Sequence, residues 1–117
     1  MAKIDATVTA TSSGNGVALA INKNPINVPP GQHDIVFQLD DQTGQTRFDN
    51  GDPIFYANGN ACPGGGKNCE ALSVESCTDT LLTVSDDNSD SIGSIGYQLN
   101  FMYGKKKAPL DPIIINT

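Results

Sequence analysis

The sequence has no tryptophan, one histidine and few charged side chains, and these shortages exclude several classes of function. Charged residues make up 17% of the 117 residues, and 13 acidic side chains against 7 basic ones give a formal charge of -6. A negative field repels phosphate backbones and anionic lipids, so we expect neither nucleic acid nor a membrane as a partner. The histidine, His33, has no nucleophile motif such as Gly-x-Ser-x-Gly beside it, so we expect no enzyme and no cofactor.

Long apolar segments are also missing. The longest uninterrupted apolar run is Val17–Ile21, far short of the roughly 20 residues that cross a bilayer. The start, Met1–Asp5, has neither the basic n-region nor the apolar h-region of a secretory signal. The chain as given is therefore expected in the cytoplasm, or in the periplasm or outside the cell if a signal peptide has been removed.

Turn formers and alternating apolar residues dominate what is present. The 12 glycines and 7 prolines, with many Ser, Thr, Asn and Asp, favour short strands over long helices. Apolar and polar residues alternate in Ile4–Thr11, Ile35–Leu39 and Tyr97–Tyr103, which is the period of half-buried strands. Further strands are expected at 17–21, 26–28, 46–48, 54–56, 82–84 and 113–115, whereas Asp86–Asp90 and Gly104–Lys107 are interpreted as turns.

This pattern predicts an all-β, two-sheet antiparallel β-sandwich of the immunoglobulin-like or cupredoxin-like kind. About seven to nine short strands, with turns about every 8 to 12 residues, are typical of that architecture. We expect one domain over residues 1–117, without substantial helix. A long Gly- and Cys-rich loop at 58–77 interrupts it, in which 72–74 could form a short strand or 71–77 one helical turn. Loops of this length often carry function.

The three cysteines, Cys62, Cys69 and Cys77, fall in this loop at separations of seven and eight residues. A zinc site with His33 as fourth ligand would be irregular, because structural zinc sites use closely spaced cysteine pairs. The alternatives are free thiols in a reducing compartment, or a Cys62–Cys69 disulfide that leaves Cys77 buried.

A second candidate metal site is Asp86, Asn88 and Asp90, which stand at i, i+2 and i+4 like the first ligands of a calcium loop. The helical calcium hand is excluded, because it needs glycine and glutamate where this chain has Ser91 and Tyr97. A looser calcium site of Asp and Asn oxygens remains a hypothesis, beside an ordinary polar turn.

Two resemblances add to this interpretation. Val28–Gly31 followed by the strand at 35–39 resembles the entry to the third strand of cupredoxin-like and immunoglobulin-like sandwiches. Cupredoxin copper sites use two histidines and a cysteine, so Cys77 and Met102 are not carried over as ligands in a chain with one histidine.

The end of the chain is similar to the DP-EP family of small bacterial proteins, in which a Tyr-rich strand precedes a terminal Asp-Pro-x-Ile-x-Asn. Here the strand is Tyr97–Tyr103, and the motif residues are Asp111, Pro112, Ile114 and Asn116. The resemblance implies a β-sandwich and no known activity. If the resemblance is set aside, the residue types alone predict that Asp111 caps a turn and that Pro112 begins an edge strand.

These observations lead to a non-catalytic binding or assembly module that acts through sheet edges or the 58–77 loop. The partner would be a protein or a second copy of the chain, because edge strands recruit partners through main-chain hydrogen bonds. The alternative is a module that binds a small ligand, either calcium at Asp86, Asn88 and Asp90, or a glycan over Tyr56, Tyr97 or Tyr103.

Overall fold

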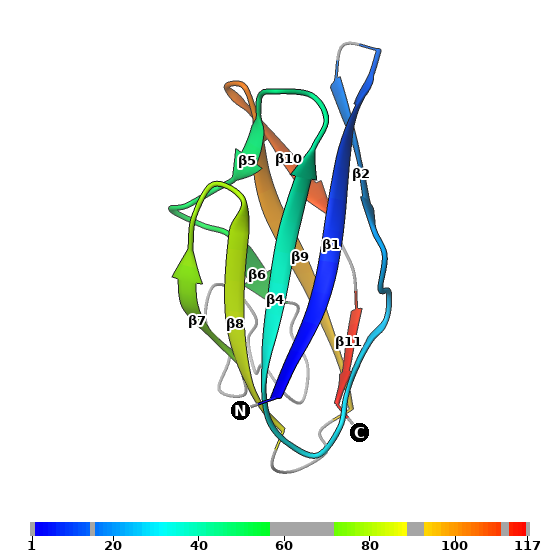
Figure 1. The fold of residues 1–117 in the computed structure, drawn as a ribbon, viewed down its shortest axis with the longest axis vertical. Coiled ribbons are helices and arrows are strands. Elements are labelled where there is room, and N and C mark those ends of the chain that lie inside the picture. The colour runs from blue at the N-terminus through cyan, green and yellow to red at the C-terminus, as the bar shows by residue number, and fades with distance from the viewer. Residues whose placement is uncertain (1, 15, 57–71, 89–92, 111–112, 117) are drawn as a thin grey trace.

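The computed structural model describes residues 2–14, 16–56, 72–88, 93–110 and 113–116, and all the regular structure within these ranges is β-strand. Figure 1 shows the strands in two layers that pack face to face. This confirms the prediction of an all-β sandwich without helix for the described ranges. They accordingly contain no helix able to span a membrane.

The first sheet has five strands in the order β2-β1-β4-β8-β7. Their bounds are β1 Ala2–Ser13, β2 Gly16–Ile21, β4 Gly31–Asp41, β7 Leu72–Cys77 and β8 Leu81–Asn88. Strands β2 and β7 are the two edges of this sheet (Figure 1).

The second sheet has six strands, with β9 at its centre. The bounds of its strands are β3 Ile26–Val28, β5 Thr46–Phe48, β6 Ile54–Tyr56, β9 Gly93–Tyr103, β10 Lys106–Leu110 and β11 Ile113–Asn116. Strand β9 pairs with β10 and β11, and also with β5 and β6, while β3 adds to β11. The chain leaves the first sheet after β2 and enters the second at β3.

Eleven strands occupy the described ranges, more than the seven to nine expected. Each sheet also contains one parallel pair, β1 with β4 and β3 with β11, which the antiparallel expectation did not include. Pattern alone reveals which face of a strand is buried, and it does not reveal which strand lies beside it. The sandwich is therefore mixed rather than wholly antiparallel.

The core lies between the sheets and is built by the predicted alternation. Ala6, Val8 and Ala10 of β1 are fully buried, as are Leu99 and Phe101 of β9. Aromatic rings fill the middle: Phe48 stacks on Phe101 at 4.7 Å between ring centroids, and Phe37 lies 5.9 Å from Tyr97. Burial of such side chains is the main contribution to the stability of the fold.

Three segments expected to be turns or loop are strands. Asp86 to Asn88 continue β8, because they pair with Gly31 to His33 of β4. Lys106 and Lys107 belong to β10, where they pair with Tyr103 and Met102. The C-terminal part of the expected 58–77 loop is β7, so the short strand considered at 72–74 is present and extends to Cys77, while residues 57–71 lie outside the described ranges. In each case pairing with another strand, whether next along the chain or distant from it, outweighs a local preference for turns.

Candidate functional site: the open edge of strand β2

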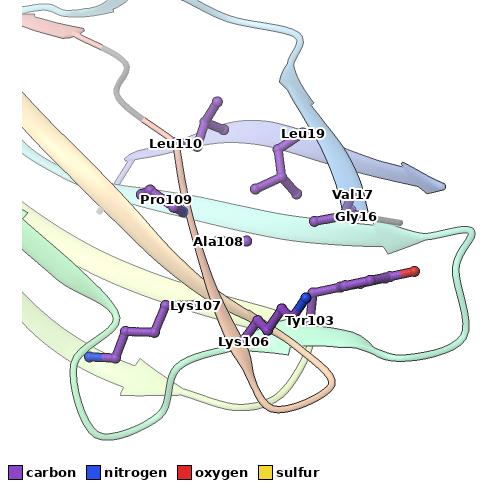
Figure 2. A pocket seen from close by; sticks show the side chains of 9 residues that line it. All are labelled: Gly16, Val17, Leu19, Tyr103, Lys106, Lys107, Ala108, Pro109 and Leu110. Carbon is purple, nitrogen blue, oxygen red and sulfur yellow. The ribbon is translucent and has the colours of Figure 1, made fainter. Parts of the chain in front are cut away.

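A groove opens where the edge strand β2 of one sheet faces β10 of the other (Figure 2). Its volume is about 320 Å³. Its lining comes from three strands: Gly16, Val17, Leu19, Tyr103, Lys106, Lys107, Ala108, Pro109 and Leu110. The groove exists because β2 and β10 end their sheets on the same side of the sandwich without pairing with each other.

The walls of the groove are apolar, and one end of it is cationic. Val17 and Leu19 on one side, and Ala108 and Leu110 on the other, pack against the core and stay only half-buried. Figure 2 shows Tyr103 and Lys106 together at one end of the groove. A hydrophobic side chain that enters here would cover apolar surface that the fold itself leaves partly exposed.

The hydrogen bonding of β2 to β1 determines which backbone groups face outward. The Asn22 N–H donates to the Thr7 carbonyl at 3.0 Å, so these two opposite residues form a hydrogen-bonded pair. Antiparallel ladders alternate between bonded and non-bonded pairs. The backbone N–H and C=O groups of Val17, Leu19 and Ile21, which stand opposite Ser12, Ala10 and Val8, therefore point away from β1 toward the open edge.

Other edge strands carry features that hinder pairing. Asn100 donates its N–H to Pro53 and accepts from Asp49, so Pro109, opposite Asn100 on β10, turns its backbone outward and has no N–H to offer. Strand β7 is interrupted by a register shift around Glu75. Charges, prolines and bulges of this kind protect edges. Among the described edge strands longer than three residues, β2 is the one without any of them.

His33 and Asp86 stand opposite each other on β4 and β8. Asp86 is fully buried, and Nδ1 of the His33 ring lies 3.1 Å from the carbonyl oxygen of Gly31, in the same strand. Asp86 and Asn88 lie in a strand rather than in the expected turn, and Asp90 lies outside the described ranges. No group of three metal-binding His, Cys, Asp or Glu side chains occurs in the part that the structure describes, and calcium binding there stays a prediction.

Tyr56 and Tyr97 pair across β6 and β9 and are core residues, 1% and 3% exposed. Burial raises the pKa of Tyr56 to about 12, with a smaller contribution from the negative charge of Asp86. Burial also raises the pKa of Tyr97. A glycan platform needs exposed aromatic faces, and among the three tyrosines Tyr103 alone reaches the surface, where it lines the groove.

The Cys77 thiol is free and half-buried at the end of β7, and its Sγ lies 3.6 Å from the Thr78 carbonyl oxygen. Burial, together with the charges of Asp49 and Asp79, raises its pKa above the ordinary value. A thiol held in its protonated form is a poor nucleophile. Cys62 and Cys69 lie outside the described ranges.

A polar cluster that the sequence did not suggest lies on the outer face of the first sheet. Gln32 donates to the Ser85 hydroxyl at 3.1 Å, and Ser85 stands opposite the buried Asp34. Glu75 contacts Asp34 through a side-chain hydrogen bond, which raises the pKa of Glu75. The contact depends on the register shift after Val74, and bulges of this kind re-aim side chains in a way that alternation does not reveal.

Of the DP-EP-like motif, Ile114 and Asn116 lie on β11, opposite Ile26 and Val28 of β3. Asp111 and Pro112 fall outside the described ranges. The chain matches no protein-family model and no curated protein. The candidate site is therefore supported by the geometry of this chain alone, and its strongest element is the unprotected edge of β2 beside the groove.

Proposed function

We propose that this chain is a non-catalytic binding module that takes up an extended segment of a protein partner as an additional strand beside β2. The observation that carries the proposal is the outward direction of the backbone N–H and C=O groups of Val17, Leu19 and Ile21 at the end of a sheet. Strand addition of this kind gains affinity from main-chain hydrogen bonds.

The groove supports the same function. In strand addition, pockets beside the edge receive alternate side chains of the incoming segment and give specificity. Val17 and Leu19 face Ala108 and Leu110 across the groove, so an apolar side chain on the core-facing side of the added strand has a place to be buried. Ala18 and Ala20, on the opposite face of β2, are exposed and too small to obstruct a neighbouring strand.

The parallel pair in the first sheet can be compared with the two fold families that the sequence resembles, the immunoglobulin-like and the cupredoxin-like sandwiches. Immunoglobulin domains are built from antiparallel sheets, whereas here β1 and β4 run parallel at the centre of the first sheet. This pair departs from the immunoglobulin pattern, and a copper centre of the cupredoxin kind would need two histidines where the chain has one.

A synthetic peptide with the sequence of residues 16–23 tests the proposal, because it has the alternation that the edge requires. Added to isotope-labelled protein, it should shift the amide resonances of Val17, Leu19 and Ile21 in a saturable way. A scrambled peptide of the same composition is the control. Absence of saturable shifts at β2, or equal shifts with the scrambled peptide, would overturn the proposal.

A further inference from the structure

The β2 edge is self-complementary. Read outward from Leu19, the strand has alanine on both sides, Ala18 and Ala20, and then a β-branched residue on both sides, Val17 and Ile21. Two copies related by a two-fold axis meet with the same surface, so residue i contacts j and j contacts i. In an antiparallel pair of β2 strands centred on Leu19, leucine faces leucine, each alanine faces an alanine, and Val17 faces Ile21, so side chains of similar kind meet at all five positions.

The directions of the backbone N–H and C=O groups of β2 also fit an antiparallel pair centred on Leu19. Leu19 directs its N–H and C=O to the open edge, and so do Val17 and Ile21. When Leu19 faces Leu19 of a second copy, Val17 faces the other copy's Ile21, and every outward N–H of the three residues meets an outward C=O. A register shifted along the strand leaves some of these groups unpaired, which costs free energy where they are shielded from water.

Charge also favours a second copy at this edge. Two chains of formal charge -6 repel each other over most approaches. Strand β2 carries no charged side chain, so pairing there places no like charges opposite each other. The core-facing row would consist of Val17, Leu19 and Ile21 from both copies, which are apolar cross-strand pairs that stabilise a sheet.

From these observations we infer that the occupant of the β2 edge is a second copy of this chain, paired antiparallel about Leu19, so that the two five-stranded sheets become one continuous sheet. This inference rests on the proposed strand-addition function and names its partner. In the dimer, Ile21 of the second copy lies beside Val17, next to the groove.

The test uses the full chain and two charge variants at exposed positions. A18E/A20E and A18K/A20K each place like charges opposite each other in the dimer, because Ala18 faces Ala20 of the other copy. Sedimentation equilibrium should show a monomer–dimer equilibrium for the parent chain and a dissociation constant at least about tenfold higher for each variant alone. An equimolar mixture of the two variants should restore dimer, because Glu then faces Lys.

V74E is the matched control, because Val74 is 42% exposed on the opposite edge strand, β7. The dissociation constant of the V74E dimer should equal that of the parent chain. A parent chain that stays monomeric up to millimolar concentration overturns the inference, and so does a dimer that survives both charge variants or a mixture that fails to pair. If the peptide of residues 16–23 still binds at β2 in those cases, strand addition stands with a different partner. If it does not, both proposals fail.

Discussion

Asn22 and Thr7 are joined twice: the Asn22 N–H donates to the Thr7 carbonyl at 3.0 Å, and the Thr7 N–H donates to Asn22 Oδ1 at 2.8 Å. This double link holds the end of β2 against β1 and fixes the phase of the ladder. Bonded and non-bonded pairs alternate along the ladder. The Asn22–Thr7 bond therefore means that Leu19, three residues earlier, points its backbone N–H and C=O away from β1.

The self-association inferred for β2 should strengthen with salt. Each copy carries a formal charge of -6, and the pairing strand itself has no ion pairs to weaken. Raising sodium chloride from roughly 0.05 to 0.5 M shortens the screening length severalfold and reduces the repulsion. Sedimentation equilibrium should therefore give a lower dissociation constant at higher salt. A dissociation constant that rises with salt would show that ion pairs hold the dimer.

The buried tyrosines should make the fold sensitive to alkali. The pKa of Tyr56 is raised by burial from 10.0 to about 12, so the folded state keeps a proton that the unfolded state loses. A raised folded-state pKa stabilises fully below the unfolded value, and this stabilisation is lost as pH rises. Between the two values the free energy of unfolding should fall by about 1.4 kcal/mol per pH unit from this group, measured by urea unfolding.

Y56F isolates that contribution. The Tyr56 hydroxyl is buried and has no hydrogen-bond partner within the described ranges, so its removal should leave stability at pH 7 unchanged or raise it by up to about 1 kcal/mol. The variant should lose part of the alkaline decline. A loss of more than about 1 kcal/mol at pH 7 would contradict an unpartnered hydroxyl.

Cys77 should react slowly with alkylating reagents. Burial, with Asp49 and Asp79 nearby, raises its pKa, and the thiolate is the reactive form. Mass spectrometry of the Cys77 peptide after iodoacetamide treatment at pH 8 should show slower labelling in the folded protein than in urea. D79N should speed the labelling of Cys77, because it removes one of the two negative charges near the thiol. Equal rates for folded and unfolded protein would contradict the raised pKa.

Asp41 should stabilise the turn between β4 and β5. Its carboxylate accepts hydrogen bonds from the Thr43 N–H at 2.9 Å, the Thr43 hydroxyl at 2.6 Å and the Thr46 N–H at 3.1 Å. Burial opposes the charge, but these bonds outweigh it and lower the pKa below 3.8. D41A should cost about 1–2 kcal/mol at pH 7.

The pH dependence of D41A follows from the sign of that shift. A lowered folded-state pKa contributes stability above the unfolded value, 3.8, and this contribution is lost as pH falls below it. The difference between the parent chain and D41A in urea unfolding should therefore shrink from pH 7 toward pH 2–3. A difference that stays constant would mean that the charge of Asp41 plays no part.

The sequence predicts most strands because alternation reports burial directly. Val8 and Phe37, for example, stand where a period of two places them and are fully buried. It missed β10 because Lys106, Lys107 and Pro109 have the composition of a turn, and only pairing with β9 makes them a strand.

The candidate site could be predicted in part. Val17, Leu19 and Ile21 share a face by alternation, and this is visible in the sequence. That β2 forms the edge of its sheet depends on the strand order, and the outward direction of its backbone depends on the Asn22–Thr7 bond. Neither relationship is visible in the alternation of β2 itself, because the strand order involves residues distant in sequence and the Asn22–Thr7 bond joins β2 to a second strand, β1.

Cysteine cross-linking at position 19 tests the central claim most directly. Opposite residues of a bonded antiparallel pair have Cα atoms about 5.5 Å apart, which is within the range that a disulfide spans. With Cys62, Cys69 and Cys77 replaced by serine, L19C should give under mild oxidation a covalent dimer whose tryptic map contains a peptide linked through position 19 of both copies, whereas V74C on β7 should not link to itself. A monomeric L19C, or a dimer linked elsewhere, would contradict pairing of β2 about Leu19.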